Sequence, residues 1–288
     1  MTIDGARGRA VVITGCSTGI GRACAVALDR AGFGVFAGVR RDADGEALRS
    51  ETSDRLEPLI IDVTDGETIA AAAERVREAT GGRLAGLINN AGITVGGPVE
   101  AIPLEDFRRQ LEVNVTGQVA VTQAFLGMIR AARGRIVFIS SIGGRGGLQF
   151  LSPYNASKAA LAAIGDSLRQ EMKPFGVDVS IVEPGSIATE IWAKGDDQAQ
   201  RLSDALDPGV LALYGERIDR MRALAAKTGA AGLPAEAVAE VVQHALTAPR
   251  PRARYVVGRD AKVQAVARRV LPHRALDRLV EREIDRAS

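Results

Sequence analysis

The chain has 288 residues, of which 46% are hydrophobic and 25% are charged, a composition typical of a globular protein that buries a core. Its length suits one large α/β domain or at most two small ones. The formal net charge of +2 and an aromatic content of 4% argue against nucleic acid as a partner.

Few residues are available for disulfides or metal binding. Cys16 and Cys24 fit a reducing compartment better than a disulfide framework, and two late histidines argue against a histidine-rich metal site. The chain shows no signal peptide and no apolar run long enough to span a bilayer. We therefore expect a soluble, cytoplasmic protein without an integral membrane segment.

The first predicted unit is a buried strand at residues 10–14, followed by a glycine-rich turn and a helix at 22–30. The turn reads Gly15-Cys16-Ser17-Thr18-Gly19-Ile20-Gly21. Glycines let backbone N–H groups approach a ligand, and the helix N-terminus favours a phosphate. The G-x-x-x-G-x-G spacing departs from the general dinucleotide pattern G-x-G-x-x-G. A glycine turn without a ligand therefore stays open.

The same turn also matches the nucleophile elbow G-x-S-x-G of α/β-hydrolases, with Ser17 as the nucleophile. Only fourteen residues precede Gly15, whereas the oxyanion loop of a hydrolase comes before the elbow. His244 and His273 offer a base, but no Asp partner stands out. The serine hydrolase is kept as a minor alternative.

The second predicted strand, at 34–39, ends in Arg40-Arg41. Enzymes that prefer NAD usually carry an acidic residue here to bind the ribose 2′-OH. An arginine suits a 2′-phosphate instead, so Arg40 favours NADP(H) over NAD, unless the pair is merely an exposed strand end. A third strand is predicted within 55–63, with Leu59-Ile60-Ile61 as its apolar run, and it ends in Asp62-Val63. Asp62 either accepts a bond from an adenine amine or forms a turn.

Further strands are predicted at 84–88, 135–140 and 177–183, with helices at 65–80 and 103–133 between them. Asn114 lies inside the second helix, where it is either buried with a polar partner or exposed. This alternation predicts a parallel, doubly wound sheet whose ligands lie beyond the carboxyl ends of the strands. The residues that follow such ends are Gly15, Arg40, Asp62, Asn90, Ser141 and Pro184.

Tyr154 and Lys158 stand four positions apart on a predicted helix, so their side chains lie on one face. A phenol normally loses its proton near pH 10. An ammonium one turn away favours the phenolate, and we expect it to lower the pKa of Tyr154 toward the range useful for proton transfer. Such a pair also occurs by chance on solvated helices.

Five motifs in order carry a resemblance to the short-chain dehydrogenase/reductase family: Thr14-Gly15-x-x-x-Gly19-Ile20-Gly21, Asn89-Asn90-Ala91-Gly92, Ser141, Tyr154-x-x-x-Lys158 and Pro184-Gly185. The chain is similar to the retinol, hydroxysteroid and 3-hydroxybutyrate dehydrogenase branch. The resemblance implies one Rossmann-type, doubly wound parallel sheet of about seven strands with helices on both faces. It also implies a homodimer or homotetramer.

By this resemblance Tyr154 is the general acid/base, Lys158 lowers its pKa and holds the nicotinamide ribose, Ser141 binds the substrate oxygen, and Asn114 positions a water. The residues expected to bind the coenzyme are Gly15, Ser17, Thr18, Gly19, Ile20, Gly21, Arg40, Asp62, Val63, Asn90, Ala91, Gly92, Tyr154, Lys158, Pro184, Gly185, Ile187 and Thr189. Two residues depart from the family pattern. Thr18 stands where many NADP-preferring relatives carry a basic residue, and Glu183 stands directly before Pro184-Gly185, where several branches carry a small or amide residue.

Residues 186–228 are expected to close over a hydrophobic alcohol or ketone. The apolar side chains that suit this lining, or alternatively the core or a subunit contact, are Leu148, Phe150, Ile191, Trp192, Leu206, Leu211, Leu213, Tyr214 and Met221. We expect a catalytic domain at 1–260 and a helical extension at 261–288. The extension is basic and amphipathic, but its acidic residues favour packing on the protein over a membrane surface.

A non-catalytic nucleotide sensor on the same fold is the main rival hypothesis, because fold does not fix function. The intact set of Ser141, Tyr154 and Lys158 favours the enzyme, an oxidoreductase that transfers hydride between NADP(H), with NAD possible, and a hydrophobic secondary alcohol or ketone.

Overall fold

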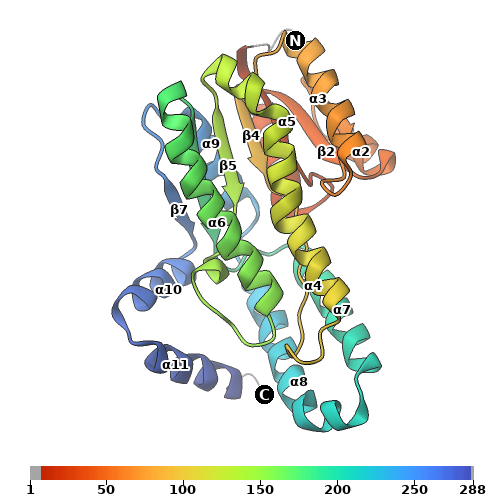
Figure 1. The fold of residues 1–288 in the computed structure, drawn as a ribbon, viewed down its shortest axis with the longest axis vertical. Coiled ribbons are helices and arrows are strands. Elements are labelled where there is room, and N and C mark those ends of the chain that lie inside the picture. The colour runs from red at the N-terminus through yellow and green to blue at the C-terminus, as the bar shows by residue number, and fades with distance from the viewer. Residues whose placement is uncertain (1–7, 287–288) are drawn as a thin grey trace.

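The computed structural model of the protein describes residues 8–286 (Figure 1). One seven-stranded sheet runs in the order β3-β2-β1-β4-β5-β6-β7, and all neighbouring strands are parallel. The strands are β1 (Ala10–Ile13), β2 (Gly34–Val39), β3 (Leu56–Ile60), β4 (Gly86–Asn89), β5 (Arg135–Ile139), β6 (Asp178–Pro184) and β7 (Arg254–Val257). The predicted doubly wound Rossmann-type fold is confirmed.

Helices cover both faces of the sheet because its strands are apolar on both sides. They are α1 (Gly19–Arg30), α2 (Asp42–Arg49), α3 (Gly66–Thr80), α4 (Leu104–Leu111), α5 (Gly117–Ala132), α6 (Ser152–Met172), α7 (Ile191–Ala205), α8 (Pro208–Ala230), α9 (Glu236–Thr247), α10 (Arg259–Val270) and α11 (His273–Asp285). In β1, Val12 packs with α3, α5 and α6, whereas its neighbours Val11 and Ile13 pack with α1, α2 and α9. Side chains alternate between faces along a strand, so two cores form.

The third strand lies within the predicted range 55–63, at Leu56–Ile60, and its Pro58 is tolerated because β3 is an edge strand. Two elements differ from the sequence expectation. The helix expected over 103–133 contains a π-helical turn at Glu112–Thr116, between α4 and α5. The tail forms two helices, since Pro272 follows the end of α10.

The end of the molecule at which α7 and α8 lie also carries α10 and α11 (Figure 1). We call the α7–α8 pair the cap. Arg222 joins its two helices by a hydrogen bond of 2.6 Å to Asp196, and Arg220 of α8 bonds Asp285 of α11 at 3.2 Å. None of the described helices has the length and apolar character needed to cross a membrane.

Candidate active site at the carboxyl edge of the sheet

The residues expected at the site lie beyond the carboxyl ends of six strands, as the parallel topology requires. Gly15 follows β1, Arg40 follows β2, Asp62 follows β3, Asn90 follows β4, Ser141 follows β5, and Gly185 follows β6. Tyr154 and Lys158 lie in the first turns of α6.

The glycine turn after β1 leaves no room for a β-carbon at Gly15 or Gly21. Gly15 has φ 71°, and a β-carbon there would lie 2.8 Å from the Cα of Ala91, while one on Gly21 would overlap the carbonyl oxygen of Gly15. The side chain of Thr189 lies across the turn, 3.2 Å from where a β-carbon on Gly19 would be. The turn and the segment after β6 therefore face each other.

Thr14 and Asn90 fasten the turns after β1 and β4 together. The Thr14 hydroxyl accepts the backbone N–H groups of Asn90 and Ala91, each at 3.0 Å. The Asn90 amide donates to the carbonyl oxygens of Thr14 at 2.9 Å and Gly15 at 3.0 Å. These bonds fix the backbone on both sides of the glycine turn.

Positive charge gathers after β2. Arg40 is exposed, while Arg41 forms two hydrogen bonds with Asp44, of 3.0 and 2.7 Å. The bond from Arg41 holds the pKa of Asp44 below its ordinary value, helped by a bond from Ser17. Burial opposes a low pKa at Asp62, but bonds from Thr64 and the charge of Arg40 lower it.

Tyr154, Ser141 and Lys158 meet between β5 and α6. The half-buried phenol of Tyr154 shares a hydrogen bond with Ser141, and the Ser141 hydroxyl also accepts the N–H of Gly143 at 3.1 Å. The buried ammonium of Lys158 donates to the carbonyl oxygen of Ile139 at 2.9 Å and lies 5.8 Å from the Tyr154 ring centroid. The predicted grouping of these three side chains is present.

The predicted direction of the Tyr154 pKa is wrong for this structure. Burial raises the pKa of the phenol, and the bond with Ser141 offsets this only in part. Lys158 does not reverse it, because its ammonium is directed at Ile139 and its own pKa is lowered to about 8 by burial. The same low-dielectric surroundings therefore favour the neutral form of both groups, but with a pKa of about 8 Lys158 remains mostly protonated at neutral pH.

Asn114 is buried, which decides between the two alternatives left open by the sequence. It lies on the π-helical turn, where its side-chain oxygen accepts the N–H of Ile93 at 2.8 Å. Its amide donates to Ile93 and to the hydroxyl of Ser157, both at 3.0 Å. A β-carbon on Gly92 would lie 3.2 Å from its oxygen and 3.6 Å from the Lys158 nitrogen. Asn114 thus joins the turn after β4 to α6.

Two further side-chain amides extend this contact, and neither was predicted from the sequence. The buried Gln110 accepts the N–H of Val95 at 2.6 Å, and Gln118 donates to the carbonyl oxygen of Ala91 at 2.6 Å. Together with Asn114 they stand four residues apart and share one helix face. The four-residue spacing of these polar side chains within an otherwise amphipathic helix is the sequence feature that could have predicted their shared role.

The remaining expected contacts lie around the glycine turn and on the segment after β6. Val63 and Ile187 are buried at 5% and 4% exposure. Gly185 is bonded to β7 through the carbonyl oxygen of Val257 at 2.9 Å, and Asp260 accepts the N–H of Ser186 at 2.8 Å. These bonds hold the strand that leads to Thr189.

Ser17 does not form a hydrolase triad. Its hydroxyl bonds Asp44, and His244 instead lies 3.1 Å from the Tyr255 hydroxyl. The structure gives the Ser17 alternative no base.

The apolar residues assigned to the substrate end divide into two groups. Phe150 and Tyr214 form an edge-to-face pair with centroids 6.0 Å apart, which joins the loop before α6 to the cap. Trp192 packs on Gly229 and donates to Ile187 at 2.7 Å. Leu213, in contrast, is 77% exposed, so it does not belong to an enclosed lining.

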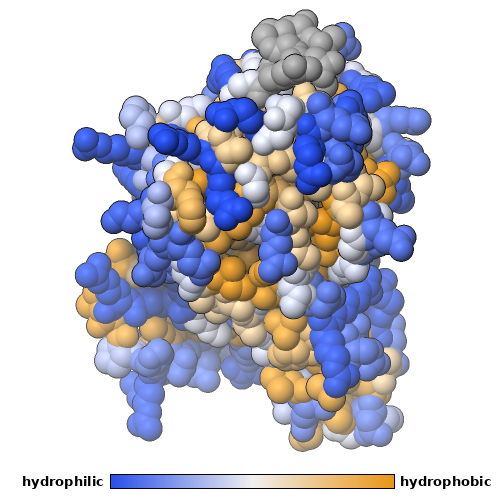
Figure 2. All heavy atoms as spheres, turned by 45° about the horizontal axis from the view of Figure 1, so that its top comes forward, coloured by the Kyte–Doolittle hydropathy of each residue, from blue (hydrophilic) through white to orange (hydrophobic). Residues whose placement is uncertain are grey.

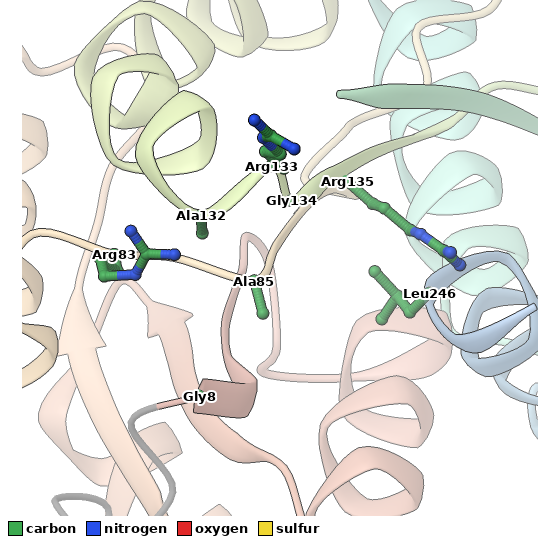
Figure 3. A pocket seen from close by; sticks show the side chains of 8 residues that line it. All are labelled: Gly8, Arg83, Ala85, Ala132, Arg133, Gly134, Arg135 and Leu246. Atoms are coloured by element: carbon green, nitrogen blue, oxygen red, sulfur yellow. The ribbon is translucent and has the colours of Figure 1, made fainter. Parts of the chain in front are cut away.

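A separate cavity of about 240 Å³ opens at the opposite, amino edge of the sheet (Figure 3). It is lined by Gly8, Arg83, Ala85, Ala132, Arg133, Gly134, Arg135 and Leu246. Ala85 and Gly134 directly precede β4 and β5, so this cavity is not part of the candidate site. Arg135 is held there by the carbonyl oxygens of Ala245 and Ala248, at 2.8 and 2.6 Å.

Comparison with known proteins agrees with this geometry. The family model described as short chain dehydrogenase matches residues 9–200. The chain is 40% identical to "Retinol dehydrogenase 16" of Mus musculus over 94% of this chain and 87% of that protein. It is 34% identical to "NADPH-dependent 3-dehydrocapnine reductase" of Ornithobacterium rhinotracheale, over 96% and 97%. A short chain dehydrogenase of Burkholderia cenocepacia solved in complex with NADP superposes with a TM-score of 0.72 at 26% identity, over 97% and 99%.

The chain belongs to the short-chain dehydrogenase/reductase family and is an oxidoreductase acting on CH–OH donors. Within the family it falls in the retinol and hydroxysteroid dehydrogenase branch. This confirms the predicted family, and coenzymes of the family are NAD(P).

Proposed function

We propose that this protein is an NADP(H)-preferring oxidoreductase that interconverts a hydrophobic secondary alcohol and its ketone, of steroid, retinoid or hydroxyacyl type. One observation carries the proposal: Tyr154, Ser141 and Lys158 meet at the edge of the sheet where the glycine turn leaves no room for a β-carbon at Gly15 or Gly21.

The residues present fit a dinucleotide. Gly15 and Gly21 leave space in the turn that a β-carbon would fill, and α1 begins within this turn, at Gly19, so N–H groups and the helix dipole can meet a pyrophosphate. Asn90 and Thr189 border the same turn. When bound, the nicotinamide supplies the hydride chemistry.

Tyr154 is proposed to hand a proton to the substrate oxygen in reduction and to take it back in oxidation. Its raised pKa keeps the phenol protonated at neutral pH, which suits the acid role. Ser141, already bonded to the phenol, would donate to the same oxygen as negative charge develops there. The Lys158 ammonium, buried one turn away, would stabilise the phenolate that proton donation leaves behind.

Asn114 is proposed to support a water that carries protons from this pair. Its side-chain amide is committed to Ile93 and Ser157, so the side chain fixes the π-helical turn. A water would then be held by groups that this turn exposes.

Arg40 supports the preference for NADP(H). It is exposed, and Arg41 beside it is committed to Asp44, which leaves Arg40 as the cation that a 2′-phosphate would meet. The name of the 34% identical reductase and the NADP-bound relative support the same coenzyme.

The substrate class is proposed from the cap. Phe150 and Tyr214 close one side with aromatic surface, and Trp192 on the first turn of α7 adds apolar surface. Such a lining suits a hydrophobic substrate rather than a polyhydroxylated sugar. The retinol and hydroxysteroid names of the relatives point the same way.

A cytoplasmic setting and a homodimer or homotetramer are proposed as well. The free, buried thiols of Cys16 and Cys24 suit a reducing compartment. Sedimentation velocity of the purified chain measures its subunit number directly.

The proposal is tested by following NADPH oxidation with a panel of steroid, retinoid and hydroxyacyl ketones, with NADH as the comparison and a sugar ketose as the polar control. We expect turnover with at least one hydrophobic ketone and a lower KM for NADPH. Tight NADPH binding with no turnover across the panel would instead support the sensor function.

A further inference from the structure

The loop that follows Ser141 is rich in glycine. Residues 143–147 read Gly-Gly-Arg-Gly-Gly, so Arg145 carries the only side chain of this stretch. Glycine has more backbone conformations open to it than any other residue and loses the most conformational freedom when it is fixed. We therefore expect the conformation of this loop to depend on contacts with its surroundings, and Arg145 is the residue that can make them through a side chain.

The start of this loop borders the side chains that are proposed to move the proton. The N–H of Gly143 donates to the Ser141 hydroxyl at 3.1 Å, and the N–H of Gly144 donates to the Ser141 carbonyl oxygen at 3.0 Å. A β-carbon on Gly143 would lie 3.6 Å from the ring of Tyr154, and one on Gly144 would lie 2.8 Å from the carbonyl carbon of Lys158. A displacement of the loop would therefore move the Ser141 hydroxyl relative to the Tyr154 phenol.

Arg145 joins the loop to the sheet and to α6. Its Nε donates to Glu183 of β6 at 3.0 Å, and its Nη2 makes a second bond to the same carboxylate. Arg254 of β7 also donates to Glu183, at 2.6 Å, and makes a further bond to Asp166 of α6. Two arginines and two carboxylates thus connect the loop to β6, to β7 and to the helix that carries Tyr154.

This network differs from an ion pair on the surface. Hydrophilic side chains project around much of the outline in Figure 2, and at such exposed positions an ion pair contributes little. The Glu183 side chain is 1% exposed and that of Arg145 is 30% exposed. A two-point contact between a planar guanidinium and a carboxylate fixes direction as well as distance. The contact between Arg145 and Glu183 can therefore place the loop and does not merely attract it.

We propose that Arg145 is a positioning residue for the reaction: its two-point contact with Glu183 places the glycine-rich loop and thereby directs the Ser141 hydroxyl at the substrate oxygen. The inference rests on the proposed role of Ser141. Arg145 acts through the loop and is assigned no contact with substrate or coenzyme. A misplacement of about 1 Å at the reacting groups can lower the rate about 100-fold, so the effect belongs in kcat. Binding of the coenzyme depends on the glycine turn after β1 instead.

The inference is tested with Arg145→Gln, which removes the two-point contact but leaves Arg254 on Glu183. The measurements are kcat for a hydrophobic ketone, KM for NADPH, and hydrogen–deuterium exchange at the amides of 142–147. We expect kcat to fall about 10- to 100-fold, KM for NADPH to stay within a few-fold, and exchange in the loop to become faster. In a Ser141→Ala background the same substitution should change kcat little, because residues that act through one another are not additive.

Arg55→Gln is the matched control. The guanidinium of Arg55 lies 3.6 Å from the carboxylate of Asp29, and the two side chains are 23% and 4% exposed. Arg55 directly precedes β3, at the amino edge of the sheet and away from the candidate site. This variant should keep the kcat and the loop exchange of the unmodified protein. Thermal melting shows whether each variant is folded, and Arg145→Lys, which keeps the charge but not the two-point contact, replaces Arg145→Gln if that variant does not fold.

Four results would overturn the inference. Loop exchange that is unchanged in Arg145→Gln would show that Arg145 does not place the loop, and an unchanged kcat with faster exchange would show that the loop does not direct Ser141. An equal loss of kcat with and without the Ser141 hydroxyl, or in Arg55→Gln, would do the same. Absence of turnover in the unmodified protein would count against the proposed function, and the exchange data would still decide whether Arg145 places the loop.

Discussion

The carboxylate of Glu183 and the guanidinium of Arg145 form a two-point ion pair beneath the loop that follows Ser141. Arg145 Nε donates to Glu183 at 3.0 Å, its Nη2 makes the second bond, and Arg254 donates to the same carboxylate at 2.6 Å. The Glu183 side chain is 1% exposed. The residue that departs from the family pattern therefore holds the loop of Ser141 to β6 and β7.

We expect Glu183→Gln to lower the free energy of unfolding by about 2–4 kcal/mol, because it removes the buried anion shared by Arg145 and Arg254 and leaves Arg254 with Asp166 alone. The measurement is urea unfolding. Glu216→Gln removes an exposed partner of Arg220, 82% accessible, and should cost less than about 1 kcal/mol. Equal losses in the two variants would mean that the Glu183 pair contributes no more than a surface pair.

Lys158 should oppose folding at neutral pH. Burial lowers the pKa of its ammonium from the ordinary value of 10.5 to about 8 in the fold. The unfolded chain therefore binds this proton more tightly, and the cost is fully present below pH 8 and disappears as the pH rises to about 10.5. Lys158→Met is expected to stabilise the protein by up to about 3 kcal/mol at pH 7, less about 1 kcal/mol for the lost bond to Ile139. The free energy of unfolding of Lys158→Met and of the unmodified protein is measured at pH 7 and pH 10, and the stabilisation by the substitution should be smaller at pH 10. A stabilisation that does not change with pH would contradict this account.

The same titration sets the pH dependence of ketone reduction. Tyr154 stays protonated through neutral pH because its pKa is raised, whereas Lys158 loses its charge near pH 8. We expect kcat/KM for reduction to be level below pH 8 and to fall above it, since the phenolate then loses its neighbouring cation. A profile that stays flat to pH 10 would show that Lys158 is not the group being titrated.

Arg40 should distinguish the two coenzymes. Arg40→Ala is expected to raise KM for NADPH about 10- to 100-fold, the value of one charge-assisted contact, and to leave KM for NADH within a few-fold. NADH serves as the control within the same variant. Equal changes for the two coenzymes would place the 2′-phosphate elsewhere.

The sequence predicted the parallel sheet and the residues at its carboxyl edge, because apolar runs and the turns that end them are local signals. The grouping of Tyr154, Lys158 and Ser141 followed from that topology. The ion pairs of Glu183 could not be predicted in this way. Arg145 and Arg254 stand 38 and 71 positions from Glu183 in the sequence, and only the packing of the fold brings the three side chains together.

The spacing of residues along the chain also could not predict how deeply Tyr154 and Lys158 are buried. The four-residue step from Tyr154 to Lys158 predicted an ammonium acting on a phenol, but the structure directs Lys158 at Ile139 and raises the pKa of Tyr154 by desolvation. For the same reason, only the structure shows that Val263, Val266 and Val270 of α10 are exposed while Ala261 of the same helix is buried.

The most direct test of the central claim compares Tyr154→Phe with the unmodified enzyme, using kcat for a hydrophobic ketone and the Kd of NADPH from fluorescence titration. Loss of the phenolic proton donor should lower kcat by about 10²–10⁴-fold, while the Kd stays within a few-fold because the glycine turn and Arg40 are untouched. Unchanged turnover in Tyr154→Phe would contradict the assignment of Tyr154 as the proton donor.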